Sequence, residues 1–244
     1  MTRFKSKMNS RAGKLSAIVV LFFMMTSLHA QTVLLHVDRA TDSIPSKHGQ
    51  NMPRYIYPFI KLGWVLGPDE KGARISYGNS IDFAFGIKKK YKVGSIYSFG
   101  WEAQLDYQVF KMVQDSGKIV PNPIQNKTER LDFSALRIGF FNRFNLDPDR
   151  GNTLGTFVDI GVSGEWNYTV RNIIKNDLLN GSKVSSAIKN QPYYTDLNAY
   201  GELRFGLGRL AFYGTYRFTD LFRPRFNFPE LPRLIAGFEL SLGN

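Results

Sequence analysis

The sequence predicts an all-β fold, an eight-stranded antiparallel transmembrane β-barrel preceded by a cleaved signal peptide. Three observations support this prediction: segments of alternating apolar and polar residues, connections that alternate between short and long, and a basic, apolar N-terminus. Aromatic residues, which favour strands and membrane interfaces, make up 14% of the 244 residues. The chain has no Cys, which excludes disulfides, thiol nucleophiles and cysteine metal sites.

Residues 1–30 are typical of a secretory signal peptide. Five cations precede the apolar run "LSAIVVLFFMMTSL", and the small residue Ala30 precedes Gln31, where we expect the mature chain to begin. The run is short for a transmembrane helix, although an uncleaved N-terminal anchor is the alternative. Because five cations lie in this leader, its removal lowers the formal net charge from +12 to +7. No basic helix or aromatic RNA-binding motif accompanies that charge, so we expect no nucleic-acid partner.

Residues 31–53 are expected to form a short periplasmic segment, and residues 54–244 the barrel. The barrel region repeats an alternating segment followed by a break, and eight such segments can be distinguished. Their approximate ranges are 54–66, 74–87, 95–111, 131–145, 154–168, 194–207, 209–219 and 233–242. One further stretch, 171–191, lies between two of them and could form a short helix.

The clearest alternation is in "YSFGWEAQLDYQVF" at 97–110, which has one apolar face and one face carrying Glu102, Gln104 and Asp106. The period alone does not tell whether the apolar face points inward or outward. Across the segments, the polar faces hold many glycines, which fit a narrow interior, and charges of both signs, which a lumen removed from water requires. These features favour apolar faces toward lipid. The alternative is a soluble lipocalin-like barrel whose apolar face lines a ligand cavity.

The polar faces are expected to form an ion network inside the lumen, because an unpaired buried charge is costly. The predicted members are Asp82, Glu102, Asp106, Arg137, Arg143, Asp159, Glu165, Glu202, Arg204, Arg217 and Glu239. A lumen filled by side chains argues against a small transport channel, which is the second functional hypothesis.

Two aromatic girdles are expected where the barrel meets the two membrane interfaces. Trp64, Tyr77, Trp166 and Phe218 would lie near one rim, and Tyr97, Phe144 and Phe205 near the other. The connections after the second, fourth and sixth segments are short, as periplasmic turns are in outer-membrane barrels. We therefore expect both termini in the periplasm, with the lipid bilayer and lipopolysaccharide around the barrel.

Several segments resemble the PorT-like outer-membrane β-barrel proteins. They are "RLDFSALRIGFFNRFNL", "GTFVDIGVSGEWNYTVRN", "YGTYRFTDLF" and "PELPRLIAGFELSLGN". The resemblance spans most of residues 54–244 and rests on strand texture, "YRFTDLF" and the terminal "PRLIAGFELSLG". It implies the fold and an outer-membrane location. The named family member is associated with a protein-secretion apparatus, and no catalytic residues can be carried over.

The barrel region offers no evident catalytic or metal chemistry. His29 lies in the leader, and His36 and His48 precede the barrel, so no expected strand or loop carries a histidine base. Glu102 and Asp106 share a face but lie about 13 Å apart along a strand. The acidic turns "GPDEKG" and "DPDRGN" lack the ligand spacing of a calcium loop. The sequence thus predicts no enzyme, metal or cofactor.

Two connections stand out by composition. "KKKYK" at 88–92 is typical of a solvated turn, with attraction of anionic headgroups or a periplasmic partner as the alternative. The loop "FRPRFNFPELPR" at 222–233 combines stiffening prolines with Phe and Arg, which are common interface hot spots. Its candidate partner-binding residues are Phe222, Arg223, Arg225, Phe226 and Phe228. The loop could equally fold over the barrel mouth.

Together, these patterns predict a non-enzymatic barrel that acts as a structural or interaction component of the cell envelope. An envelope protein is its candidate partner, and an accessory role in a secretion or other envelope assembly follows from the resemblance. A small transport channel and a soluble lipocalin-like barrel are the alternatives.

Overall fold

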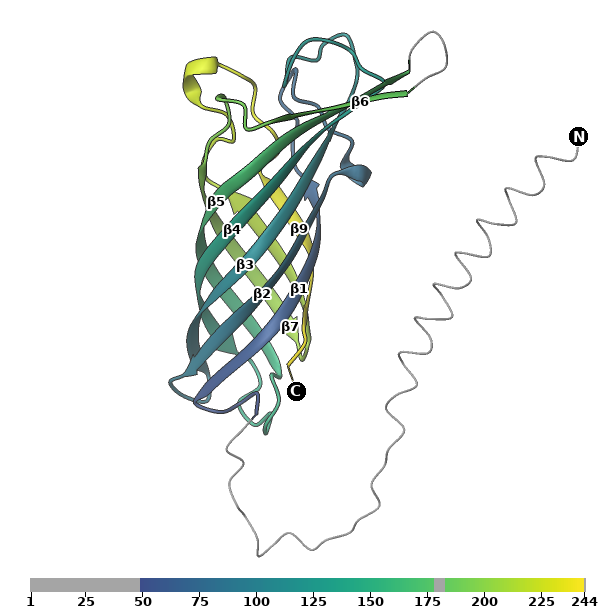
Figure 1. Cartoon of the computed structure of the whole chain (residues 1–244). Coiled ribbons are helices and arrows are strands. Elements are labelled where there is room, and N and C mark those ends of the chain that lie inside the picture. Colours follow the sequence, from purple (N-terminus) through teal and green to yellow (C-terminus); the bar gives the residue numbers. More distant parts are fainter. Residues whose placement is uncertain (1–48, 178–182, 244) are drawn as a thin grey trace, which may run out of the picture. The chain divides into compact units, whose positions relative to one another are not determined.

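The computed structural model describes residues 49–177 and 183–243. Within them, nine strands form one antiparallel sheet that closes on itself (Figure 1). The strands are β1 (Arg54–Leu66), β2 (Ile81–Lys92), β3 (Tyr97–Met112), β4 (Thr128–Asn145), β5 (Thr156–Asp177), β6 (Lys183–Lys189), β7 (Leu197–Leu207), β8 (Leu210–Arg217) and β9 (Leu234–Ser241). Their order is β4-β3-β2-β1-β9-β8-β7-β5-β6, and the β4–β5 pairing completes the ring. The predicted all-β, eight-stranded barrel is confirmed, with β6 lying outside the ring.

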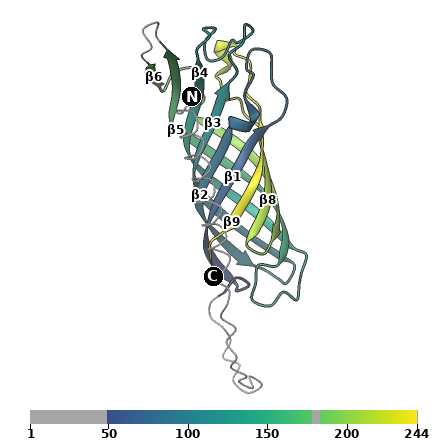
Figure 2. The same cartoon turned by 90° about the vertical axis from the view of Figure 1, so that its right-hand side faces the viewer.

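The two ends of the barrel differ in their connections. One end, called here the short-turn end, carries residues 93–96, 146–155 and 208–209 and the end of β9. The opposite, long-loop end carries residues 67–80, 113–127 and 218–233, together with β6. Figure 2 shows the two sets at opposite ends of the barrel. None of the helices in the described residues is both long and apolar enough to cross a membrane.

The strand registers pair inward-facing residues of one strand with inward-facing residues of the next, all around the ring. Directly opposed residues include Lys61 and Ala84, and Asp159 and Arg204. Inward positions are buried, whereas the outward face exposes large apolar side chains such as Phe140, which is 66% exposed. The barrel therefore has an apolar exterior and a charged interior, the reverse of a lipocalin-like barrel.

The second strand differs from its predicted range. Residues 74–80 were expected to open it, but they form a bridge at Ile75 and the short 3-10 helix η2 (Tyr77–Asn79), because "SYGNS" is rich in turn-forming residues. At the other end the strand continues to Lys92, so the interpretation of "KKKYK" as a solvated turn was wrong. Lys88 and Lys90 keep the strand alternation and are fully buried in the lumen.

The helix considered for 171–191 was also wrong. Strand β5 runs without a break to Asp177, and β6 pairs with its last residues from Arg171 onward. The β-branched residues Val170, Ile173 and Ile174 favour the extended conformation, and β4 offers a continuous partner as far as Thr128. Residues 178–182 between β5 and β6, and the predicted leader and first part of the periplasmic segment, lie outside the described residues.

Glycines on the inward face make room for large side chains from neighbouring strands. Gly206 of β7 lies directly opposite Phe157 of β5. An added Cβ at Gly206 would be 2.1 Å from the tip of the Phe157 ring. The same ring is in contact with the Arg143 guanidinium, whose carbon lies 3.5 Å from the ring centroid. Gly206 thus sets the position of an aromatic ring that supports a buried cation.

We predict that Gly206→Ala destabilises the barrel by about 1–3 kcal/mol, because Phe157 must move away from Arg143. The matched control is Gly164→Ala on the outward face, where an added Cβ meets nothing within 4 Å. Alanine there should be neutral or slightly stabilising, because it restricts the unfolded chain. Reversible urea unfolding in lipid vesicles measures both. Equal effects of the two substitutions would contradict this account of Gly206.

Candidate functional site

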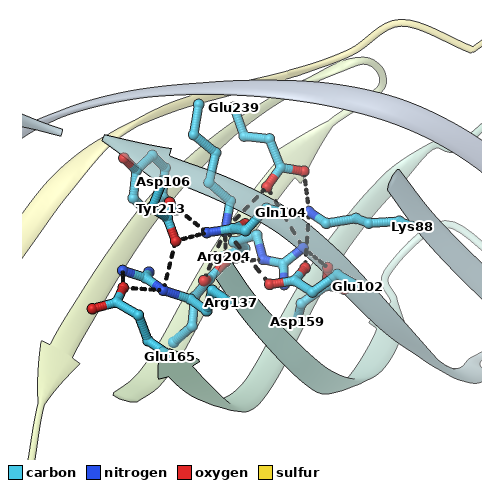
Figure 3. A network of polar contacts seen from close by, with 12 residues as sticks. Lys88, Glu102, Gln104, Asp106, Arg137, Asp159, Glu165, Arg204, Tyr213 and Glu239 are labelled. Atoms are coloured by element: carbon cyan, nitrogen blue, oxygen red, sulfur yellow. Dashed lines mark hydrogen bonds and ion pairs between the residues drawn. The ribbon is translucent and has the colours of Figure 1, made fainter. Parts of the chain in front are cut away.

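Charged side chains from the barrel strands fill the lumen (Figure 3). All eleven residues proposed from sequence for the ion network are at most 5% exposed. These residues are Asp82, Glu102, Asp106, Arg137, Arg143, Asp159, Glu165, Glu202, Arg204, Arg217 and Glu239. They do not form one continuous set of contacts. Nine of them form two groups in the lumen, and Asp82 and Arg217 lie outside both groups.

The first group is centred on the Arg204 guanidinium of β7. Its nitrogens lie 2.5 Å from Glu202, 2.7 Å from Glu102, 3.4 Å from Asp159 and 3.6 Å from Glu239. These four carboxylates come from four different strands. A planar guanidinium can contact several carboxylates at once, which makes Arg204 the geometric centre of the lumen.

Three further cations balance this group. Lys61 Nζ lies 2.9 Å from Glu202, and Lys88 Nζ lies 3.4 Å from Glu102 and also pairs with Glu239. Arg143 donates two hydrogen bonds to Asp159, at 2.7 and 2.8 Å. With Arg204, these residues place four cations against four carboxylates, so the group is electrically neutral.

Lys61 and Lys88 were not among the residues predicted for the network. The signal for Lys88 was present in the sequence. Lys88 follows Asp82 by six residues, so on a continuous strand the two side chains point to the same face. A strand that continued through "KKKYK" would therefore place Lys88 in the lumen.

The second group surrounds Arg137 of β4, closer to the long-loop end. Its guanidinium contacts Asp106 at 2.9 Å and Glu165 at 2.5 Å. Tyr200 donates a hydrogen bond to Glu165 at 3.0 Å, and Gln104 donates to Asp106 at 2.9 Å. Neutral donors therefore satisfy the carboxylate oxygens that the single cation does not reach.

Asp82 and Arg217 differ from the expected network. Within the described residues Asp82 makes no ion pair, and it accepts a hydrogen bond from Tyr213 at 3.3 Å. Arg217 lies at the end of β8 and pairs with Glu230 of the following loop at 2.6 Å, so it anchors a loop rather than the lumen. Burial raises the pKa of Glu230, and the nearby Arg217 guanidinium acts in the opposite direction.

An apolar cap closes the lumen at the long-loop end. Inward residues at the strand ends pack there against side chains from the loops that connect them. The members of the apolar cap are Val65, Ala73, Ile75, Phe110, Met112, Val120, Leu131, Phe133, Val170, Tyr194, Tyr213, Leu221, Phe222, Leu231 and Ile235. All of them are nearly inaccessible to solvent.

The short-turn end is closed by residues 49–53 and the 146–155 connection. The backbone carbonyl of Gln50 accepts a hydrogen bond from the buried Lys90, at 2.5 Å, and its side chain accepts one from Leu154 N–H, at 2.9 Å. Asn51 accepts a hydrogen bond from Arg150 at 2.8 Å. The end of the expected periplasmic segment is thus part of the barrel, which the sequence did not predict.

The proposed girdle residues occupy different environments. Trp166 and Phe218 are 52% and 59% exposed near the long-loop end, and Trp64 is half-buried there. Near the short-turn end, the Tyr97 and Phe144 rings are 5.7 Å apart and Phe205 lies opposite Phe212.

Tyr77 is an exception to the girdle. It lies in η2 rather than on the strand wall, donates a hydrogen bond to Gly67 O at 2.5 Å and packs against the apolar cap. The predicted strand at 74–87 had placed it on the outer wall.

The candidate partner-binding loop is only partly accessible. Phe222 is 2% exposed and belongs to the apolar cap, and Phe228 is half-buried against it. Arg223 donates to Tyr194 O and pairs with Asp196, both at 2.8 Å. Only Arg225 is fully exposed, with its guanidinium 4.7 Å from the half-buried Phe226 ring. The loop therefore covers the barrel mouth and presents a small outer surface.

No group of three or more acidic, His or Cys side chains in the described residues is arranged to hold a metal ion. The histidines at positions 36 and 48 lie outside the described residues.

No protein-family model matches the chain, and no curated protein matches it. Among solved structures, the chain is similar to Ail, the attachment invasion locus protein of Yersinia pestis, whose crystal structure was determined with the heparin analogue sucrose octasulfate. The match has 9% identity and a TM-score of 0.32, and it covers 78% of this chain and 96% of Ail. The assignment of an outer-membrane-type barrel therefore rests on the strand pairing and the apolar exterior of this chain.

We predict that Arg204→Met destabilises the barrel by about 3–5 kcal/mol, because four carboxylates then share too few cations. Arg54→Met, at an exposed position at the start of β1, is the control and should cost less than about 0.5 kcal/mol. Adding Glu102→Gln to Arg204→Met should recover part of the loss. Urea unfolding after refolding into vesicles measures all three variants, and equal costs for the two arginine variants would contradict a stabilising network.

Proposed function

We propose that this protein is a non-enzymatic outer-membrane barrel that acts by contact with an envelope partner at its long-loop end. The observation that carries the proposal is the closed lumen. Ion pairs fill its middle, and the apolar cap and residues 49–53 cover its two ends. The wall of the barrel is committed to lipid outside and to the ion network inside, so binding must use the ends.

The distribution of apolar side chains supports the placement in the outer membrane. Lipid must cover the exposed Phe, Leu and Ile of the strands, and a closed barrel satisfies every strand backbone group in the absence of water. The predicted signal peptide supports export, and short turns on the periplasmic side support an outward-facing long-loop end. In this orientation the end of β9 and residues 49–53 lie on the periplasmic side.

The alternatives receive less support. A channel needs a continuous water path, which the Arg204 and Arg137 groups occupy. A lipocalin-like site needs an apolar cavity where this barrel has charges. The resemblance of the sequence to PorT-like proteins supports a place in a secretion or other envelope assembly, and we retain that as the proposed context.

The partner surface we propose is centred on the short 3-10 helix η3 (Pro224–Phe226). Phe222 and Arg223 hold the loop to the barrel, which leaves Arg225 and Phe226 as the residues available for contact. A pre-ordered loop loses little conformational entropy on binding. The proposal thus retains the predicted loop but divides its residues between anchoring and contact.

We expect the purified protein to show no steady conductance in planar bilayers, because the lumen is filled along its length. Single-channel recording over a range of voltages tests this. A barrel made with Arg204→Ala and Glu102→Ala, which removes two large lumen side chains, is the comparison that could open a path. A stable, ion-selective pore in the wild-type protein would overturn the proposed function and revive the channel hypothesis.

We predict that Arg225→Ala combined with Phe226→Ala abolishes co-purification of an envelope protein but leaves the barrel folded, because neither residue belongs to the apolar cap. The matched control is Arg74→Ala with Ile119→Ala, two exposed residues from other loops at the same end. Quantitative mass spectrometry of native-envelope preparations and the heat-induced gel shift provide the two readouts. A lower unfolding temperature with unchanged co-purification would instead identify η3 as part of the closure.

A further inference from the structure

The extended part of the sheet beyond the barrel rim carries a cluster of cations on its outward face. Its members are Lys111 of β3, Arg130 of β4, Arg171 and Lys175 of β5, and Lys189 of β6, called here the cationic face. The outward positions of this region also carry two carboxylates. Asp132 is fully buried between Arg130, at 3.1 Å, and Arg171, at 3.9 Å. Asp177, at the end of β5, pairs with Lys127. The five cations thus face two acids, one of which is paired with a further cation, Lys127, so positive charge remains in excess.

The strand register places like charges directly opposite each other in this region. Lys111 is the partner of Arg130, and Arg171 is the partner of Lys189. Directly opposed like charges destabilise a sheet unless something neutralises them. The buried Nε of Arg171 also lacks a hydrogen-bond acceptor among the described residues. Both features indicate a place for an anion.

A groove of about 290 Å³ runs across the cationic face. Lys111, Arg130 and Lys175 line it. The rest of its lining consists of Thr128, Asn79, the apolar Val109 and Ile173, and Glu129, whose buried carboxylate pairs with Lys118. Clustered Lys and Arg side chains and polar groups bind phosphate oxygens through charge-assisted and neutral hydrogen bonds. The groove is partly open to solvent, so it could accept a group carried by a larger molecule.

The position of the cationic face relative to the membrane interface indicates which larger molecule carries the bound group. Outward aromatic residues, Tyr107 on β3 and Trp166 and Tyr168 on β5, precede it along the strands toward the membrane. Such residues sit at headgroup level, and Lys111 is about 13 Å beyond Tyr107 along the strand. The cationic face therefore lies level with the phosphorylated sugars of the outer leaflet, given the orientation in the proposed function.

We propose that the cationic face is a binding site for the phosphate groups of lipopolysaccharide. The phosphates would lie in the groove between Lys111, Arg130 and Lys175, with acyl chains along the apolar barrel wall below. Lipid-borne phosphate gains from both contacts, whereas a free phosphorylated sugar gains only from the first. This inference rests on the proposed outer-membrane orientation and adds a ligand at a site separate from the η3 loop.

The test uses the refolded full barrel in micelles of a neutral detergent, with Trp fluorescence or calorimetry as the readout. The probes are lipid A with two phosphates, the same lipid after enzymatic dephosphorylation, and free glucosamine 1,6-bisphosphate. We expect the bisphosphorylated lipid to bind at least about tenfold more tightly than either of the others. We expect Arg130→Gln with Lys175→Gln to weaken its binding about tenfold or more, because each cation near an anionic surface contributes substantially.

The matched control is Arg54→Gln with Lys89→Gln, which removes two outward cations from the short-turn rim. Both double variants lose the same charge, and the gel shift establishes that each is folded. Equal weakening by the two variants would show non-specific attraction and would overturn the site. Equal binding of the free bisphosphate would overturn the lipid assignment. If folded wild-type protein binds none of the probes, the inference fails, while the conductance and co-purification results decide the proposed function separately.

Discussion

The requirement that a buried charge be neutralised governs the interior of this barrel. Eight strands enclose a space too narrow for bulk water, and the alternation of every strand delivers polar residues into it. Arg204 satisfies the requirement by meeting four carboxylates, with Lys61, Lys88 and Arg143 completing a neutral set. The cost of removing these ions from water is met only because the contacts are many and come from several strands at once. Those contacts also fix the relative positions of the strands that supply them.

The cationic face is built from the same kinds of residue as the lumen, but its charges are not balanced. Inside the barrel, acids and bases are equal in number around Arg204, and an external ligand would have no place there. On the extended part of the sheet, Lys111 of β3 lies opposite Arg130 of β4, and Arg171 of β5 lies opposite Lys189 of β6. Arg130 and Arg171 share the carboxylate of Asp132. Charge left unbalanced at an accessible surface is typical of a binding site, whereas balanced buried charge is typical of structure.

At the two ends of the barrel, residues outside the strands close the lumen. At the long-loop end, loop residues such as Val120, Leu221 and Phe222 fold inward and join the apolar cap, and Glu230 pairs with Arg217 beside them. At the short-turn end, Gln50 lies across the mouth and accepts a hydrogen bond from Lys90. Both ends are closed by residues of the connections and of the segment before β1, rather than by the strands alone. This closure is what directs the proposed function to the outer surfaces.

The sequence by itself determined the fold class, the number of barrel strands and the direction of most side chains, because a period of two and the requirement for lipid on one face leave few alternatives. It also determined which residues of six of the eight barrel strands point into the lumen. Among them are Arg204 and Arg137, the centres of the two groups of ion pairs. Only the tertiary structure decided which charges pair, since partners such as Lys61 and Glu202 are far apart in the chain. The alternation of the sequence is compatible with Lys88 inside the lumen, but only the pairing of β2 with β1 and β3 decided that the strand extends so far, because the end of a strand depends on the length of its neighbours. The β5–β6 extension and its cationic face likewise depend on pairing between strands, which no local pattern specifies.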